Sequence, residues 1–339
     1  MKKLLLFSFL ILSCNQGINL NEEQSYFSET DPEWAYRGDE EQFSIFYYKG
    51  IPFTGVIKGN YTRKHLDDYN KKVRNRKLSS NFLRVEKRNE YYSYKVGWEF
   101  KKTFKEGKLD GLFEEYYENG QLFRKTFNKG GKLNGIYEQY YETGQLNVKS
   151  NWKDDLRDGR FESYYENGQL MSRVILNRGY ANGPFEEYYE NGQLKNKTIY
   201  NEGKEDGLSE LYYENGQLKN KITYNKGSQD GPFEQYYENG QLYIKGNFTR
   251  STSGSSSGVK TGLYEEYYEN GNLFIKTIYR YGILNGSYEE YYNNGNKFIK
   301  TTYKNGTLDG SYEKYDANGK LLVKTIYREG RDASGKIIF

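Results

Sequence analysis

The acidic residues that could act in acid–base chemistry recur at a regular spacing. Over most of the chain a glutamate occurs every 24 residues, with one step of 31. The series comprises Glu114, Glu138, Glu162, Glu186, Glu210, Glu234, Glu265, Glu289 and Glu313. Neighbouring members on a sheet would lie about 10 Å apart, which approaches the carboxyl separation of inverting glycoside hydrolases. A lysine or arginine follows each glutamate eleven residues later. A facing cation lowers the pKa of a carboxyl and makes it a poor proton donor, so we predict no enzymatic function and keep a hydrolase using this column as a remote alternative.

Other catalytic and metal-binding patterns are absent from the sequence. The chain has one histidine, His65, and one cysteine, Cys14, and it lacks the motifs of phosphate loops, serine hydrolases and zinc proteases. Asp154, Asp155 and Asp158 lack the later bidentate glutamate of a calcium loop, so we interpret them as a solvated bend. We expect no cofactor, no metal and no catalytic residue.

The whole composition limits the partners that can be considered. The net charge is +4 over 339 residues, which is too small to indicate nucleic acid. Mean hydropathy is −1.00, a value typical of disordered chains, yet 38 tyrosines and 37 glycines oppose disorder. The chain is therefore expected to fold with tyrosine in the role that leucine, isoleucine and valine usually take.

Glycines mark the same repeat as the glutamates. They fall at Gly111, Gly135, Gly159, Gly183, Gly207, Gly231, Gly262, Gly286 and Gly310. The single longer step holds a Ser/Gly-rich insertion near residues 250–258, a composition typical of flexible loops. An insertion that leaves the following repeats in register is what a stacked array tolerates.

Each repeat has the signature of a β-hairpin. In the unit that starts at Gly183, Asn191-Gly192 predicts a two-residue type I′ turn. The flanks are rich in Tyr, Phe, Ile and Thr, which favour strands. Glycines such as Gly207 are expected at the outer bends. We predict an all-β fold, an elongated solenoid-like array of stacked antiparallel β-hairpins with a 24-residue repeat.

The predicted turn fixes which residues face each other across the hairpin. It places Glu186 opposite Lys197, Gly183 opposite Tyr200 and Tyr189 opposite Leu194, and all nine units then pair an acid with a base. In the unit from Gly286, Lys297-Phe298 stands in the place of the leucine and is expected to displace that strand by one residue.

Alternation along the strands then sorts two faces. The first is predicted to carry Phe185, Tyr189, Leu194 and Tyr200. The second is predicted to carry Glu186, Tyr188, Lys195, Lys197 and Ile199. On this second, charged face a row of tyrosines is expected to run through all the repeats.

The N-terminus has the layout of an exported protein. A basic start precedes the apolar run Leu4–Leu12, which is far shorter than the roughly 20 residues of a membrane span. The tetrad Ile11-Leu12-Ser13-Cys14 resembles the bacterial lipobox, which implies cleavage before Cys14 and lipidation of that cysteine. We expect residues 1–13 to be a lipoprotein signal peptide and the protein to be a membrane-anchored lipoprotein of the cell envelope. An ordinary signal peptide with a chance cysteine is the alternative.

The remaining chain divides at changes of pattern. We predict a tether at 14–42, a degenerate N-terminal repeat or cap with a basic insertion at 43–110, nine hairpin repeats at 111–330 and a capping strand at 331–339. The segment Lys58–Arg88 has a charge of +8. It is either a solvated insertion or a contact with anionic lipid head groups.

The repeated Tyr-Tyr-Glu-Asn-Gly-Gln-Leu run, as in Tyr188–Leu194, resembles MORN-type repeats in the bacterial variant identified as the YwqK antitoxin family. The resemblance covers Gly111–Gly330 and, more weakly, Phe43–Ile57. It implies a protein-interaction role, antitoxin-like or immunity-like. The chain has far fewer glycines between aromatics than eukaryotic MORN repeats, so lipid binding through the repeats is not implied.

These patterns together predict a non-enzymatic, membrane-anchored binding scaffold that presents a Tyr/Glu/Lys surface to a protein partner. The alternative is a carbohydrate-binding or structural lipoprotein of the envelope, since aromatic rows also suit glycans. Nucleic acid is not an expected partner. The candidate partner-binding residues are Tyr116, Tyr140, Tyr164, Tyr188, Tyr212, Tyr236, Tyr267 and Tyr291.

Overall fold

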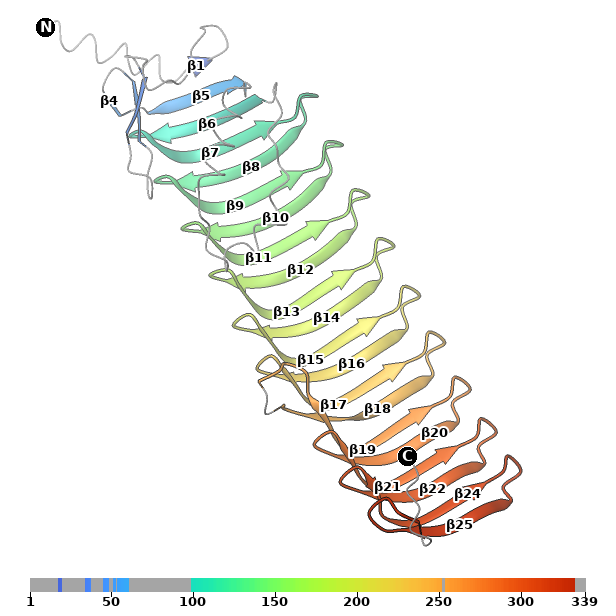
Figure 1. Cartoon of the computed structure of the whole chain (residues 1–339). Helices are drawn as coiled ribbons and strands as arrows, with labels where there is room; N and C mark the ends of the chain where they lie inside the picture. Colours follow the sequence, from blue (N-terminus) through green and yellow to red (C-terminus); the bar gives the residue numbers. More distant parts are fainter. Residues whose placement is uncertain are drawn as a thin grey trace, which may run out of the picture. The chain divides into compact units, whose positions relative to one another are not determined.

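The computed structural model (Figure 1) describes residues 18–19, 34–37, 45–48, 51–52, 54–60, 99–251 and 254–332. Within these ranges all regular structure is β, and no helix long and apolar enough to cross a membrane occurs. The chain divides into two compact units, Met1–Gln169 and Leu170–Phe339. The predicted all-β hairpin array is confirmed in both units.

The first unit contains a small sheet and a long meander. The small sheet consists of β2 (Trp34–Arg37), β3 (Ile45–Tyr48) and β4 (Ile51–Pro52), and β1 (Ile18–Asn19) pairs in parallel with β5. From β5 onward each strand pairs antiparallel with the next. The meander consists of β5 (Gly55–Asn60), β6 (Glu99–Lys105), β7 (Lys108–Tyr116), β8 (Leu122–Lys129), β9 (Lys132–Tyr140), β10 (Leu146–Lys153) and β11 (Leu156–Tyr164).

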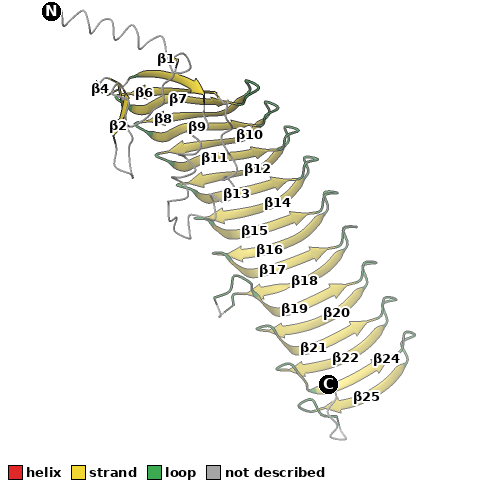
Figure 2. Cartoon of the chain, turned by 45° about the horizontal axis from the view of Figure 1, so that its top comes forward, coloured by secondary structure: helices red, strands yellow, loops and turns green. Residues whose placement is uncertain are grey.

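The second unit is an antiparallel meander throughout, as the ribbon in Figure 2 shows. From β12 to β22 each strand pairs with the next, β22 pairs with both β23 and β24, and β24 pairs with β25, so successive hairpins form one continuous sheet within the unit. Its strands are β12 (Leu170–Asn177), β13 (Tyr180–Tyr188), β14 (Leu194–Asn201), β15 (Lys204–Tyr212), β16 (Leu218–Asn225), β17 (Ser228–Tyr236), β18 (Leu242–Thr249), β19 (Val259–Tyr267), β20 (Leu273–Arg280), β21 (Ile283–Tyr291), β22 (Lys297–Lys304), β23 (Thr307–Leu308), β24 (Gly310–Tyr315) and β25 (Leu321–Tyr327).

Several predicted segments fall partly or wholly outside the described ranges. Cys14 and most of the basic insertion lie outside them, as do residues 333–339 of the predicted capping strand. Within the predicted tether the structure describes the short strands β1 and β2. Arg331 forms an isolated bridge with Arg328 after the last hairpin.

The predicted hairpin register is confirmed. Glu186 pairs with Lys197 and Gly183 with Tyr200. Every predicted acid–base pair that lies within one unit is found, from Glu114 with Lys125 to Glu313 with Lys324. The displacement expected at Lys297-Phe298 is wrong, because Lys297 pairs with Tyr291 in the same way that Leu194 pairs with Tyr188.

The turn at Asn191-Gly192 differs from the predicted type I′ turn. Only Gly192 has a positive φ, at 84°, and its N–H donates to the Tyr189 carbonyl at 2.9 Å. The loop is therefore a type I turn followed by a left-handed glycine, which makes a three-residue connection. Asparagine suits this turn because its Oδ1 accepts from the N–H of Gln193 at 2.9 Å.

This turn makes the predicted pairing of Tyr189 with Leu194 wrong. Leu194 pairs with Tyr188 instead, and a β-bulge at Lys195 then adds one residue to the second strand. The two irregularities cancel, which is why the register of Glu186 and Lys197 is the predicted one although the turn is not.

Type I′ turns occur at the other bend of the repeats, except between β18 and β19, where the Ser/Gly-rich insertion takes the place of the turn. Glu202 and Gly203 have φ values of 49° and 78° between the paired residues Asn201 and Lys204. Gly207, predicted at this bend, lies inside β15 at a bulge, so that prediction is wrong. In the first unit Asp154 and Asp155 form the equivalent turn, with φ values of 51° and 68°.

Two faces follow from the observed pairing. The ladder face is defined in the Gly183 repeat by Pro184, Glu186, Tyr188, Leu194, Lys197 and Ile199, and by their equivalents in other repeats. The aromatic face is defined by Phe185, Glu187, Asn196, Thr198 and Tyr200 and their equivalents. Leu194 was predicted on the face of Phe185 and Lys195 on the opposite one. Both predictions are wrong, because the bulge exchanges the two residues and brings Lys195 Nζ within 2.8 Å of Glu187 Oε1.

The buried residues lie mainly on the aromatic face. Phe233 is 3% exposed and stacks on Phe248 with 4.1 Å between ring centroids. Small hydroxyl side chains such as Thr198 and Thr277 are buried beside the rings. The ladder face, by contrast, exposes large apolar side chains such as Ile199. Tyrosine and phenylalanine on one side of each repeat therefore supply the core.

Candidate binding surface

The predicted tyrosine row exists, and the hydroxyl of each member is held by its own strand. Tyr188 ends β13 and donates to Glu186 Oε2 at 2.7 Å, because residues two apart on a strand point to the same face. The same bond, at 2.7–3.1 Å, is made by Tyr140, Tyr164, Tyr212, Tyr236, Tyr267, Tyr291 and Tyr315. Tyr116 is also hydrogen bonded to its strand glutamate, Glu114. Within each unit the row is a fixed array of half-buried rings.

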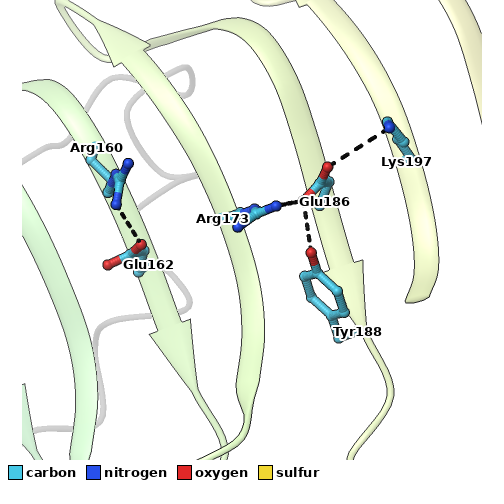
Figure 3. Close-up of polar contacts among 6 residues, drawn as sticks. All are labelled: Arg160, Glu162, Arg173, Glu186, Tyr188 and Lys197. Carbon is cyan, nitrogen blue, oxygen red and sulfur yellow. Dashed lines mark hydrogen bonds and ion pairs between the residues drawn. The ribbon is translucent and has the colours of Figure 1, made fainter. Parts of the chain in front are cut away.

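Each glutamate of the ladder face lies between two cations rather than one. Glu186 contacts Arg173 from β12 and Lys197 from β14 (Figure 3). Glu265 Oε2 lies 2.7 Å from Lys245 Nζ, and its Oε1 lies 3.0 Å from Lys276 Nζ. The sequence predicts the base in the same hairpin but not the second base, which comes from the preceding strand. That base is placed by pairing between hairpins, as Lys197 with Glu210 shows.

The result is a charge ladder in which acid and base alternate from strand to strand within each unit. Burial alone would raise the pKa of Glu265, but hydrogen bonds from Lys245, Tyr267 and Lys276 outweigh it and lower the pKa to about 2. Burial, reinforced by Glu234, raises the pKa of Tyr236 to about 12. Such a carboxylate is charged and such a phenol neutral at pH 7, so neither is suited to proton transfer.

Apolar side chains flank the charge ladder on the same face. Leu194 lies opposite Tyr188 at one end of the strand, and Ile199 lies opposite Pro184 beyond the charges. Exposed large apolar residues at the positions of Pro184 and Ile199 are Phe127, Ile136, Ile175, Ile199, Leu263, Ile278 and Ile326. The ladder face thus combines a charged centre with apolar margins.

The second tyrosine of each motif links repeats instead. Tyr189 donates its hydroxyl to the carbonyl of Tyr212 at 2.8 Å, and Asn191 Nδ2 donates to the carbonyl of Glu214 at 3.3 Å. The same tyrosine bond is made within the units by Tyr117, Tyr141, Tyr213, Tyr237, Tyr268 and Tyr292. This row stabilises the array, because each hydroxyl links one hairpin to the next.

In the part of the chain that the structure describes, no three or more histidine, cysteine, aspartate or glutamate residues are grouped so that they could hold a metal ion.

The sequence matches the MORN repeat variant in nine segments that together cover more than half of the chain. The chain belongs to the MORN repeat variant family. The matched segments are residues 109–128, 133–154, 157–175, 181–202, 205–226, 229–249, 260–281, 284–305 and 308–329. Each begins near the bend that precedes a hairpin and takes in that hairpin, so this MORN repeat is the structural repeat seen here.

Comparison with curated proteins found no match. Among solved structures, the chain is similar to one titled "Crystal Structure of TcdB2-TccC3-Cdc42", with 11% identity, 71% of this chain, 16% of that chain and a TM-score of 0.19. A second is the Photorhabdus luminescens Tc holotoxin pore, with 13% identity, 70% of this chain, 16% of that chain and a TM-score of 0.18. The chain thus spans less than a fifth of the length of these structures.

Proposed function

We propose that this MORN repeat protein is a non-enzymatic binding scaffold that presents its ladder face to a protein partner. MORN repeats generally serve as binding and scaffold elements. The observation that carries the proposal is the tyrosine row, whose rings are half-buried and whose hydroxyls are fixed on glutamates. A side chain that is already ordered loses little conformational entropy when a partner binds it.

The surroundings of the row support a protein as the partner. Tyrosine with charged and apolar neighbours is the composition of binding hot spots, where a ring fills a desolvated contact and charges set the orientation. The lowered pKa of carboxyls such as Glu265 argues against the hydrolase alternative. If binding inhibits the partner, the role of the protein is antitoxin-like or immunity-like.

Membrane attachment through a lipid on Cys14 is part of the proposal. Each buried methylene of an acyl chain contributes about 0.8 kcal/mol, so a multiply acylated cysteine holds firmly to a bilayer. Replacing Cys14 by serine is expected to move the protein from the membrane fraction to the soluble fraction. A Cys14→Ser protein that stays membrane-bound would rule out this anchor.

The test of the binding surface uses two matched variants of the full chain. One replaces Tyr188, Tyr212 and Tyr236 by alanine. The control replaces Tyr180, which begins β13 next to a bend, and Tyr281, which lies in a bend. The two are 65% and 68% exposed and lie away from the row. Both variants and the wild type are immobilised and exposed to an envelope extract, and bound proteins are identified by mass spectrometry.

The proposal predicts one protein that the wild type and the control retain and that the row variant loses by at least about tenfold, since a buried tyrosine at an interface contributes 1 kcal/mol or more. Equal retention by all three proteins would overturn the assignment of the ladder face. Binding to a glycan array that disappears only in the row variant would instead favour the carbohydrate alternative.

A further inference from the structure

One column of the aromatic face carries glutamates that differ in their counter-charges. Its members are Glu115, Gln139, Ser163, Glu187, Leu211, Gln235, Glu266, Glu290 and Lys314. Glu115 forms an ion pair with Arg124, and Glu187 forms one with Lys195. Among the described residues no ion pair to Glu290 is found, although it is equivalent to these glutamates. The group that neutralises the negative charge of the Glu290 carboxylate therefore has to be identified.

In the preceding repeat, the equivalent glutamate, Glu266, has its counter-charge supplied by a lysine of the same chain. The hydroxyl of Tyr264 donates to Glu266 Oε2 at 3.2 Å, and the rings of Tyr264 and Tyr279 meet edge to face with centroids 5.4 Å apart. Lys260 Nζ lies 4.1 Å from the centroid of Tyr264 and 5.3 Å from that of Tyr279. Its charge also interacts with Glu266. The two rings and the carboxylate thus form a site that is occupied by an alkylammonium group.

The Glu290 repeat has the same site without the lysine. Tyr288 donates to Glu290 Oε2 at 3.1 Å, and Tyr288 meets Tyr303 edge to face with centroids 5.6 Å apart. The position of Lys260 is taken by Leu284, which lies across from Tyr279 as Lys260 lies across from Phe248. The rings and the carboxylate are kept, and the cation is missing.

The other basic positions near Glu290 do not replace it. Phe298 occupies the position equivalent to Lys195, which forms an ion pair with Glu187. Lys314, the next residue in the column, directs its ammonium to the ring of Phe298, with Nζ 5.3 Å from the centroid. The carboxylate of Glu290 and the faces of Tyr288 and Tyr303 are therefore left without a cation among the residues that the structure places.

A buried hydroxyl beside the site is also unsatisfied. Thr301 pairs across the strands with Tyr288 and is 3% exposed, and its Oγ1 has no hydrogen-bond partner among the described residues. The equivalent Thr277 donates to the carbonyl of Ser287 at 3.1 Å. Buried polar atoms are normally satisfied, so the Thr301 hydroxyl is a second difference between the two repeats beside the ring of Tyr288.

We propose that Tyr288, Glu290 and Tyr303 form a binding site for an alkylammonium cation, supplied by a lysine side chain of a basic segment in a partner. The carboxylate provides the counter-charge and the two rings provide cation–π contacts, as they do for Lys260 one repeat earlier. The site lies on the face opposite to the tyrosine row. A partner can thus occupy it independently of the ladder face, and the proposal does not rest on the proposed function.

The test measures binding of a fluorescein-labelled hexalysine peptide to the full chain by fluorescence anisotropy, with n-butylammonium chloride as competitor and sodium chloride at equal ionic strength as its control. The variants are Glu290→Gln and Glu202→Gln. Glu202 is exposed in a type I′ bend, outside both the Glu290 site and the ladder face. The two variants therefore make the same charge change inside and outside the proposed site.

We expect Glu290→Gln to weaken peptide binding about fivefold or more, in keeping with a cation–π and charge contact of about 1 kcal/mol, and Glu202→Gln to change it less than twofold. Butylammonium should displace the peptide from the wild type more effectively than sodium does. Equal weakening by both variants, or wild-type binding by Glu290→Gln, would overturn the proposal.

An exchange between repeats gives a second, independent readout. Leu284→Lys should fill the site from within, as Lys260 does, and abolish the specific component of peptide binding. Lys260→Leu should open the Glu266 site and raise the stoichiometry of specific peptide binding. Unchanged thermal melts by circular dichroism would show that the variants fold, and unchanged binding in both folded variants would contradict the proposed site.

Discussion

The two faces of the sheet differ in how strictly they repeat. On the ladder face every repeat places an acid between bases and a tyrosine beside it, from Glu138 and Tyr140 to Glu313 and Tyr315. On the aromatic face equivalent positions vary from glutamate to leucine to lysine. The uniform face selects the register, because cross-strand pairs favour one alignment. The varied face holds the buried rings and, at Glu290, a departure from the pattern that suggests a specific site.

The largest expected effect is a difference in unfolding free energy between alanine substitutions on the two faces. Phe233→Ala removes a ring that is 3% exposed and stacked on Phe248, and it is expected to lower the free energy of unfolding by about 3 kcal/mol. Tyr236→Ala, on the ladder face of the same strand, should cost about 1.5–2 kcal/mol, because its ring is only half-buried and its bond to Glu234 is also lost. Urea unfolding of the full-length variants measures both. Equal losses would contradict the assignment of the core to the aromatic face.

A smaller effect concerns the pH dependence of the ladder. The folded-state pKa of Glu265 is about 2, below its ordinary value of 4.5, so its charge stabilises the fold above about pH 4.5. This contribution is lost as the pH falls from 4.5 toward 2. Glu265→Gln should therefore destabilise the protein at pH 7 and have a diminishing effect on the melting temperature toward pH 2. A difference from wild type that stays constant over this range would contradict the ion pairs with Lys245 and Lys276.

The smallest effect tests the hydroxyls of the tyrosine row. Tyr236→Phe removes the 2.8 Å bond to Glu234 and leaves the ring in place, so a loss of about 0.5–1 kcal/mol in unfolding free energy is expected. Tyr281→Phe is the control, because that tyrosine is 68% exposed in a bend. Should the two variants be equally stable, the row would not be held by its glutamates in solution.

Much of the fold could be predicted because the acid–base spacing over-determines the hairpin register. The sequence could not predict on which face Leu194 and Lys195 lie, because a type I turn with a left-handed glycine and a type I′ turn both favour Asn-Gly. The bulge that compensates the longer turn leaves no mark in the alternation of residues. Only the backbone pairing shows that Leu194 lies with Tyr188.

The candidate sites were predicted to different extents for a related reason. The tyrosine row is periodic and was found from the sequence. The second base of each glutamate depends on the bulge at positions such as Gly207, which sets the offset between hairpins. The Glu290 site is a single exception among repeats. It becomes visible only when Lys260, Leu284 and their ring neighbours are compared in space.

The most direct test of the account is a pair of engineered disulfides in a chain whose Cys14 is replaced by serine. Glu186→Cys with Lys197→Cys joins directly paired positions on one face, and such pairs lie within disulfide reach. Glu187→Cys with Lys197→Cys shifts one partner to the opposite face. We predict rapid, near-complete closure of the first pair under mild oxidation and none of the second, measured by thiol titration. Closure of the second pair in preference to the first would contradict the register from which both faces are derived.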